Sequence, residues 1–421
     1  MNKAIAMLLG ILIVLPAQAQ TLADALEQAW ARHPQAAAVS AREDEARARA
    51  DVAAGITPGP ASLSLSSLND RLNRNRGKQE WEAEMAVPLW LPGQQSARVA
   101  EAESTFAEVA ARRTALRLQI AGEVREAWWA VADARNARDL ARRRATTAGA
   151  LEADVLRRFK AGDLARIDAN LAQGERLAAE AEAIEAEAAL LRAEHIYRNL
   201  TGAAAPSVLA AEAALAAREP VGPHPQPLSR EGRGERSESL RDLPGPDHPQ
   251  LAAVAAAAQT ARAKLRVAEE TRRDAPEIAL RVVRERGEFA EPYASTVGVK
   301  LTIPFSSGAR VRQESSAARA EASQADAELA LARLRLQLDT EKARLDLAAA
   351  ERQFAMASVR RELTADNLRL AEKAFSLGES DLTTLLRVRA DAFEAEAFLN
   401  RQQVARAAAQ SRLKQVLGVL P

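Results

Sequence analysis

The chain has 421 residues, and its 58 lysines and arginines nearly balance its 57 aspartates and glutamates, giving a net charge of +1. It contains no cysteine, which excludes disulfides and thiolate metal sites, and its evenly mixed charge excludes the basic surface typical of nucleic-acid binding. Aromatic residues make up only 4%, and the chain is rich in alanine, glutamate, leucine and arginine, a composition typical of long helices and not of an enzyme core.

The first 19 residues have the pattern of a signal peptide. Lys3 supplies a positive start, an apolar run too short to span a bilayer covers residues 4–15, and Ala17 and Ala19 form a small-residue cleavage site. We therefore expect an exported protein whose mature chain starts at Gln20. No cysteine follows the cleavage site, so a lipoprotein-type anchor is not expected.

The mature sequence repeats itself. "HPQAAAV" begins at His33 and recurs as "HPQLAAV" from His248, a shift of 215 residues, and Gly162 recurs as Gly378 with a shift of 216. A nearly constant shift over most of a chain indicates tandem copies of one structural unit. Each copy is expected to contain a helix, a strand pair, a very long helix, a tight turn and a return helix.

The first copy is expected over residues 20–217. After a Pro-Gly-Pro break, "ASLSLSSL" alternates over 61–68 and "QEWEAEMAVPL" over 79–89, and this period of two predicts strands. Residues 94–159 then contain no proline and only two glycines, which predicts a helix about 100 Å long. Such a helix cannot bury an apolar stripe alone, so it must pack against others.

The second copy is expected over residues 248–421, after a connector that breaks the repeat. Residues 218–247 are rich in proline, glycine, serine and arginine, so we expect a flexible linker there; a tolerated insertion is favoured over a docking role. Strands are expected over 276–286 and 294–305. The long helix is expected over 309–375, with leucines at three-, four- and seven-residue steps that predict a packing seam.

The strand pairs point to a membrane and to several copies of the chain. Strands of eight to ten residues have the length that crosses a bilayer when tilted. An open four-stranded sheet would leave unpaired edges in lipid, and barrels need at least about eight strands. Two copies would give a barrel filled by its own side chains, whereas three copies would give twelve strands and a pore. We therefore expect a homotrimer.

Three segments stand out besides the two repeats: "TLADALEQAWARHPQ" from Thr21, "VPLWLPG" and "GDLARIDANLAQGE". Together with the repeats, they resemble the TolC-like outer-membrane efflux channels. The resemblance covers the mature chain from Thr21 except the linker. Within the family, "HPQAAAVSAREDEARA" is most similar to the cation-efflux branch of the CzcC type. The resemblance implies a mainly α fold with a small transmembrane β part: a trimeric 12-stranded barrel in the outer membrane of a Gram-negative bacterium, continued by a long periplasmic α-helical barrel.

The same resemblance implies a passive exit duct and no enzyme. Its partners would be outer-membrane lipid, a periplasmic adaptor of the membrane fusion type and an inner-membrane pump of the RND type. Its cargo would be heavy-metal cations, or otherwise drugs or other small molecules. The adaptor-facing tips would comprise Arg158, Lys160, Gly162, Leu164, Lys373, Leu377, Gly378 and Leu382.

The family's closed periplasmic gate carries aspartates six residues after the tip glycines. Asp168 matches this position in the first copy, whereas Thr384 occupies it in the second, and Arg387 stands at the other acidic position. An acidic ring is therefore incomplete in this chain. We expect Asp168→Ala to make the channel leakier.

The barrel lumen is expected to contain Glu80, Glu82, Glu84, Arg281 and Lys300. These residues give a net charge of −1 per chain, so a solvated polar face is favoured over a lining that attracts cations. His33 and His248 occupy equivalent places before proline and are expected at helix ends, and neither a metal site nor a cofactor site is expected.

Two other classes of function share some of these sequence features. A periplasmic coiled-coil adaptor or a trimeric fibre would share the signal peptide and the long helices, but it would not need two strand pairs at equivalent positions. An exported enzyme is disfavoured because the chain has no cysteine nucleophile and no phosphate-binding glycine loop after a strand.

Overall fold

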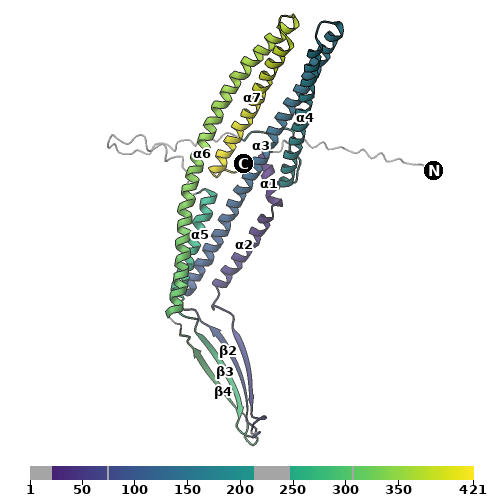
Figure 1. The fold of residues 1–421 in the computed structure, drawn as a ribbon. Helices are drawn as coiled ribbons and strands as arrows, with labels where there is room; N and C mark the ends of the chain where they lie inside the picture. Colours follow the sequence, from purple (N-terminus) through teal and green to yellow (C-terminus); the bar gives the residue numbers. More distant parts are fainter. Residues whose placement is uncertain (1–20, 74, 213–246, 306–307) are drawn as a thin grey trace, which may run out of the picture.

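The computed structural model of the chain describes residues 21–73, 75–212, 247–305 and 308–421. The expected signal peptide and nearly all of the expected linker lie outside these residues. The described chain contains the order helix, strand pair, long helix and return helix twice, and the first series has an additional short helix at its start (Figure 1). The first series comprises α1 (Leu22–Arg32), α2 (Pro34–Ala53), β1 (Ser62–Asn69), β2 (Gln79–Pro88), α3 (Gln94–Ala161) and α4 (Arg166–Thr201). The second series comprises α5 (Pro249–Glu270), β3 (Glu277–Arg286), β4 (Ala294–Thr302), α6 (Gly308–Ser376) and α7 (Leu382–Val416).

The two longest helices run the length of an elongated helical body. α3 has 68 residues and α6 has 69, so each is about 100 Å long. α3 packs against α2, α4, α5 and α7, and α6 packs against α5 and α7, so α4 and α6 lie at opposite edges of the body. The sheet extends from one end, and the α3/α4 and α6/α7 hairpins form the other (Figure 1). None of the helices in the described part of the chain combines the length and apolarity needed to cross a membrane.

Glycines stop both long helices. Gly162 and Gly378 adopt φ values of 89° and 78°, a left-handed conformation that side chains with a Cβ rarely adopt. In each turn the next N–H bonds back to the helix: Asp163 donates to the Arg158 carbonyl and Glu379 to the Ala374 carbonyl, both at 2.9 Å. These bonds form the Schellman motif, which satisfies carbonyls at the helix end and allows the chain to reverse.

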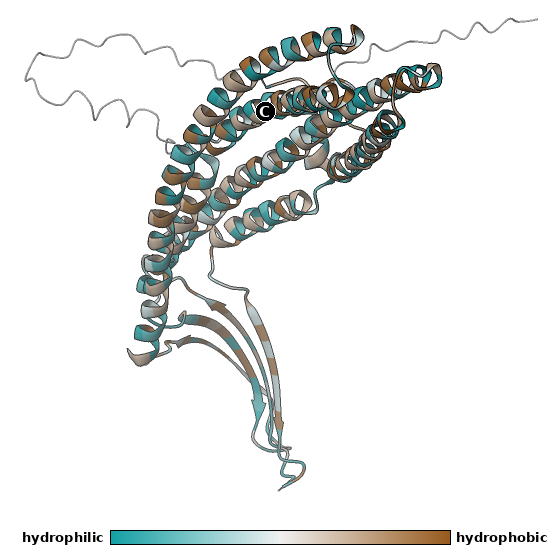
Figure 2. Cartoon of the chain, turned by 45° about the horizontal axis from the view of Figure 1, so that its top comes forward, coloured by the Kyte–Doolittle hydropathy of each residue, from teal (hydrophilic) through white to brown (hydrophobic). Residues whose placement is uncertain are grey.

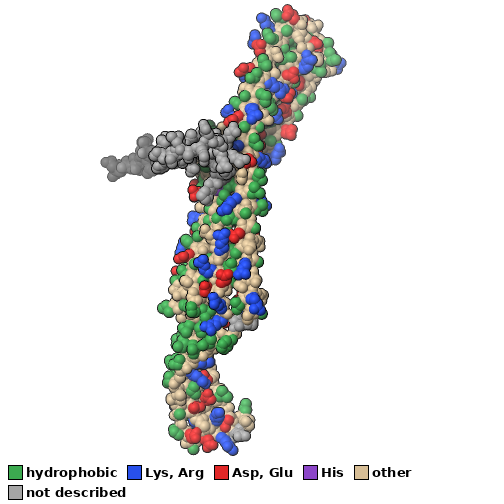
Figure 3. Space-filling view, turned by 90° about the vertical axis from the view of Figure 1, so that its left-hand side faces the viewer, with side chains coloured by type: hydrophobic (Ala, Val, Ile, Leu, Met, Phe, Trp, Pro, Cys, Tyr) green, Lys and Arg blue, Asp and Glu red, His purple; other side chains and the backbone are tan. Residues whose placement is uncertain are grey.

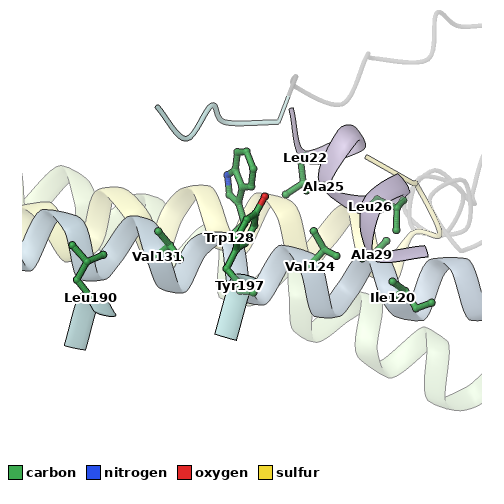
Figure 4. Close-up of a cluster of buried hydrophobic side chains, with 12 residues drawn as sticks. Leu22, Ala25, Leu26, Ala29, Ile120, Val124, Trp128, Val131, Leu190 and Tyr197 are labelled. Atoms are coloured by element: carbon green, nitrogen blue, oxygen red, sulfur yellow. The ribbon is translucent and has the colours of Figure 1, made fainter. Parts of the chain in front are cut away.

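The main hydrophobic core lies where the first series folds on itself. Trp128 of α3 is fully buried and packs beside Tyr197 of α4, with ring centroids 6.2 Å apart (Figure 4). Leu22 and Leu26 of α1 cover the same cluster, together with Val124 of α3 (Figure 4). Burial of large aromatic rings stabilises such a junction strongly, so this core joins α1, α3 and α4 into one unit.

The four strands form a single antiparallel sheet in the order β1-β2-β3-β4 (Figure 2). The register aligns apolar side chains across all four strands on one face. One row contains Leu63, Met85, Leu280 and Val299, and the next contains Leu65, Ala83, Val282 and Val297. The large side chains in these rows are 41–76% exposed. The sheet therefore presents a continuous apolar face that nothing in the described chain covers.

The prediction of a mainly helical chain with two strand pairs is confirmed, and the element bounds differ slightly from those expected. β4 ends at Thr302, short of the expected residue 305, because Pro304 has no N–H to continue the pairing. α3 continues to Ala161, directly before the glycine that stops it. On the face shown in Figure 3, acidic and basic side chains mix along the helical body and hydrophobic ones gather where the body meets the sheet.

Candidate functional site

The polar face of the sheet holds the five residues expected in the lumen. Alternation along β2 places Glu80, Glu82 and Glu84 on the face opposite Trp81 and Met85. The cations of β3 and β4 lie on the same face as these glutamates and bind two of them. The Arg281 guanidinium donates to the Glu82 carboxylate at 3.0 Å, and the Lys300 ammonium lies 3.1 Å from the Glu84 carboxylate.

Small residues let Lys300 reach across a strand. Its register partner on β3 is Ala279, which is buried, and Ala86 of β2 pairs with the same alanine. With no long side chain between them, the lysine of β4 contacts the glutamate of β2 directly. Ion pairs on a water-exposed surface contribute little stability, so these contacts chiefly set the charge pattern of the face.

The register adds two carboxylates that the sequence analysis did not count. Glu277 and Glu285 alternate with the apolar residues of β3, so they lie on the face of Arg281, and Glu285 is the register partner of Glu80. The five carboxylates and two cations of this face give a net charge of −3 per chain, which corrects the expected −1. The alternation along β3 in the sequence was enough to predict that Glu277 and Glu285 lie on this face.

The opposite end of the molecule contains the two hairpin tips. Five of the eight residues expected to face a partner are exposed there: Lys160, Gly162, Lys373, Leu377 and Gly378. Gly162 and Gly378 form the turns themselves, and the other three lie in the last turn of α3 or α6, or directly after it. Three lysine and leucine side chains are thus presented at the end of the helical body.

The other three expected tip residues pack between the hairpins. The Arg158 guanidinium lies 5.2 Å from the centre of the Phe375 ring, and Leu164 packs against the same cluster. Leu382 is 2% exposed, so the expectation that it faces a partner is wrong for the described chain. Its side chain fills a core that joins the two hairpins, formed by Leu151, Val155, Ala169, Ala172, Phe375, Leu382 and Leu385.

The residues expected at the gate form the start of each return helix. The Asp168 carboxylate accepts the N–H of Ala165, the residue that caps α4, at 3.1 Å. At the second tip the cap of α7 is Asp381, whose carboxylate accepts the N–H of Thr384 at 2.7 Å. Arg387, one turn further, is exposed.

The two tips therefore carry their capping carboxylate at different positions of the first helical turn. A shift of 216 residues relates Ala165 to Asp381 and Asp168 to Thr384, so the acid stands at the third helical position in one copy and at the cap in the other. Either position satisfies a backbone N–H at the helix start and places a negative charge at the positive end of the helix dipole. The acid expected at Thr384 is present three residues earlier. Asp381 is the residue that the sequence analysis missed.

The hydrogen bonds at the second tip also affect the ionisation of the Asp381 carboxyl group. The bond from Thr384 and the nearby positive charge of Arg387 hold the pKa of Asp381 below its usual value. The ionised form is therefore the one that caps α7 at neutral pH.

A buried ionic network at mid-length links the two repeats. Arg125 of α3 contacts Glu212 at 2.8 Å, and Lys414 of α7 approaches the same carboxylate at 3.2 Å. Burial opposes ionisation of Glu212, but the bonds from Arg125 and Ser411 outweigh it and hold its pKa below the usual value. This network ties the end of the first repeat to the C-terminal helix, and no sequence motif had indicated it.

The histidines do not converge on a ligand. His33 and His248 cap α2 and α5, where each ring nitrogen accepts the N–H two residues later, at 3.3 and 3.2 Å. Among the described residues, no group of three or more histidines and carboxylates is arranged to hold a metal ion.

Comparisons with known proteins agree with this geometry. Residues 247–419 match the family model of the outer membrane efflux proteins. The cobalt-zinc-cadmium resistance protein CzcC of Cupriavidus metallidurans is 28% identical over 223 residues, which are 53% of this chain. The aligned part spans about half the length of that relative.

Solved structures share the fold over nearly the whole chain. The outer-membrane protein VceC of Vibrio cholerae superposes with a TM-score of 0.72 at 16% identity, covering 94% of this chain and 96% of the other. The CusC channel gives a TM-score of 0.74 at 13% identity, covering 95% of this chain and 92% of the other. The prediction that the chain is not an enzyme is confirmed by the match to this group of channels. Residues 247–419 thus belong to the outer membrane efflux protein family, and the described chain has the fold of solved outer-membrane channels.

Proposed function

We propose that the chain forms the outer-membrane exit duct of a tripartite efflux system and conducts substrates passively out of the cell. The observation that carries this proposal is the sheet, with one uninterrupted apolar face and one charged face, at the end of a helical body about 100 Å long. A protein that stayed in the periplasm would not need ten or so exposed apolar side chains on one sheet. A duct needs that face to contact lipid and the charged face to contact water.

Three copies would close the duct. The outer edges of β1 and β4 are unpaired in the single chain, and lipid does not tolerate unpaired strand edges. The helical body has matching features: α6 exposes Leu331, Leu334, Leu338 and Leu345, which are 45–71% exposed, and α4 exposes Leu177, Ile184 and Leu191 at seven-residue steps. Because α4 and α6 lie at opposite edges, the apolar stripe of one copy would pack against the next copy.

The tips would meet the periplasmic adaptor and the closed gate would lie beside them. The exposed Lys160, Lys373 and Leu377 surround the two glycine turns and support contact with an adaptor that links the duct to an inner-membrane pump of the RND type. Asp168 lies at the start of α4, so a movement of the α3/α4 hairpin would change the width of the channel at its periplasmic end.

Metal cations are the proposed substrate class. The similarity to CzcC, named for cobalt, zinc and cadmium resistance, supports this class, as does the −3 charge per chain on the polar face of the sheet. Drugs or other small molecules remain the alternative cargo. Cells that lack the chain should become sensitive to cobalt, zinc or cadmium while their drug sensitivity stays unchanged; the opposite pattern would refute the metal assignment.

Membrane fractionation and planar bilayers test the duct itself. We expect detergent-extracted, heat-modifiable trimers in the outer-membrane fraction, and stepwise conductance when they are added to a planar bilayer. A soluble periplasmic species would support the alternative, a coiled-coil adaptor or fibre without a membrane barrel. The double variant Glu82→Gln with Glu84→Gln tests the charged face separately from assembly. It should reduce the cation selectivity of the conductance and leave trimer assembly unchanged.

A further inference from the structure

The end of the sheet farthest from the helices carries an arginine pair on its apolar face. Alternation along β3 places Arg284 and Arg286 on the same face as Leu280 and Val282, directly after the last apolar row. The register partner of Arg284 on β2 is Trp81, which is half exposed. Charged side chains also appear at this end in the space-filling view (Figure 3).

Aromatic rings hold both guanidinium groups. The Arg284 and Arg286 guanidinium carbons lie 4.9 and 4.8 Å from the centre of the Tyr293 ring, and Arg286 lies 5.4 Å from the centre of the Phe289 ring. The Tyr293 hydroxyl is itself fixed by a 2.7 Å bond to the Gln79 side chain. Arg286 also donates through Nε to the Gly77 carbonyl at 3.1 Å and through Nη2 to the Gln79 side-chain oxygen at 3.4 Å, which fixes the group in place. The N–H groups of the exposed Arg284 and the remaining ones of Arg286 can donate to an anion.

No acidic partner neutralises the pair. Among the described residues, Arg284 and Arg286 form no ion pair, and the nearby carboxylate of Glu291 accepts the N–H of Gly287 instead. Arg76 and Lys78, in the loop between β1 and β2, are also exposed at this end. The apolar face of the sheet thus ends in unneutralised positive charge.

The position of the pair matches a membrane surface, given the membrane-inserted barrel that we propose. From Val87 to Trp81 the apolar face of β2 extends about 20 Å along the strand, which in a tilted strand spans about 15 Å, the larger part of the apolar band of about 25 Å in outer-membrane barrels. An arginine on the lipid face is costly at mid-bilayer and nearly free of cost at the interface. Arg284 and Arg286 would therefore lie at the level of the outer-leaflet headgroups.

We infer that Arg284, Arg286 and Tyr293 form a binding site for the phosphate groups of the phosphorylated glycolipid that forms the outer leaflet of a Gram-negative outer membrane. Guanidinium groups bind phosphate through paired N–H donors, which are among the strongest hydrogen bonds of proteins. The neighbouring apolar rows would contact the acyl chains of the same molecule, so one lipid would satisfy both the apolar and the cationic parts of this face.

The test compares lipid binding to the reconstituted full-length channel. Native mass spectrometry would measure the affinity for lipid A carrying both phosphates, for lipid A with its phosphates removed, and for phosphatidylglycerol. The variant is Arg284→Gln with Arg286→Gln, and the matched control is Arg281→Gln, on the opposite face of the same strand. We expect the double variant to bind phosphorylated lipid A more weakly by roughly fivefold for each arginine, and the control to bind it like the wild type.

Each outcome decides the inference. Equal binding of the phosphorylated and dephosphorylated forms, equal binding of phosphatidylglycerol, or equal losses in the double variant and the control would overturn it. If the double variant failed to fold, the single change at the exposed Arg284 would serve in its place. Flotation of the wild type with vesicles is scored separately: a chain that does not float refutes the proposed duct, whereas one that floats and conducts without preferring the phosphorylated lipid refutes only this site.

Discussion

The two hairpin tips have the same backbone and different surfaces. Both long helices end in a Schellman turn at a glycine, but the phenylalanine three residues before each glycine has a different environment. Phe159 of the first tip is 37% exposed, whereas Phe375 of the second is 7% exposed and lies under the Arg158 guanidinium of the first. Both tips thus have the same turn, but the phenylalanine of the second tip packs against the first tip.

The two tips differ in where their apolar side chains lie. The second tip supplies Phe375, Leu382 and Leu385 to the core between the hairpins, so its apolar side chains face inward. The first tip leaves Phe159 on the surface, where an adaptor or a neighbouring copy could cover it. A duct that opens by moving one hairpin against the other would have to separate this core.

The largest expected effect comes from the two phenylalanines. Phe375→Ala should cost about 3–5 kcal/mol because it leaves a cavity in the core between the hairpins. The matched change Phe159→Ala should alter stability by less than about 1 kcal/mol because the ring is on the surface. Hydrogen exchange over residues 151–172 and 368–386 would measure both. Equal effects of the two changes would show that the tips are not asymmetric.

The sequence predicts the turns of the tips but not their asymmetry. Gly162 and Gly378 can be identified as helix stops because a positive φ at a helix end favours glycine, and this is a local requirement. The period-two runs likewise determine the strands and, once Glu277 and Glu285 are counted, the charge of the polar face. The burial of Phe375 depends on how the two hairpins pack against each other, and the local sequence around Phe159 and Phe375 does not determine that packing.

Capping provides a smaller test of the comparison. Asp381→Ala removes the acceptor of the Thr384 N–H, and losing a cap of this kind should speed hydrogen exchange in the first turn of α7 by roughly fivefold. Asp381→Asn should preserve the exchange rate because asparagine caps a helix about as well as aspartate. Peptides covering residues 382–390 would report the difference, and unchanged protection in the alanine variant would exclude the cap.

The pH dependence of the second tip follows from the same bond. The pKa of Asp381 is lowered in the folded chain, so its contribution is present above the unfolded pKa of about 4 and is lost as the pH falls through the folded value. The difference between the wild type and Asp381→Ala should therefore be full at pH 7 and shrink as the pH falls below about 4. A difference that stays undiminished in acid would indicate that the carboxylate acts by another means than its charge.

Asp168 has the smallest expected effect on stability and the most informative effect on conduction. Asp168→Ala should loosen the start of α4 by roughly twofold in hydrogen exchange, since it removes one bond to the Ala165 N–H and one charge in the first turn. We also expect it to raise the leak through the closed channel in planar bilayers. The double change Ala165→Asp with Asp168→Thr gives the first tip the cap arrangement of the second. If the leak arises from the lost cap, this exchange variant stays as closed as the wild type, whereas an equal leak in both variants would assign the effect to the charge at position 168 itself. Unchanged conductance in Asp168→Ala would remove this residue from the gate and leave it as a helix cap alone.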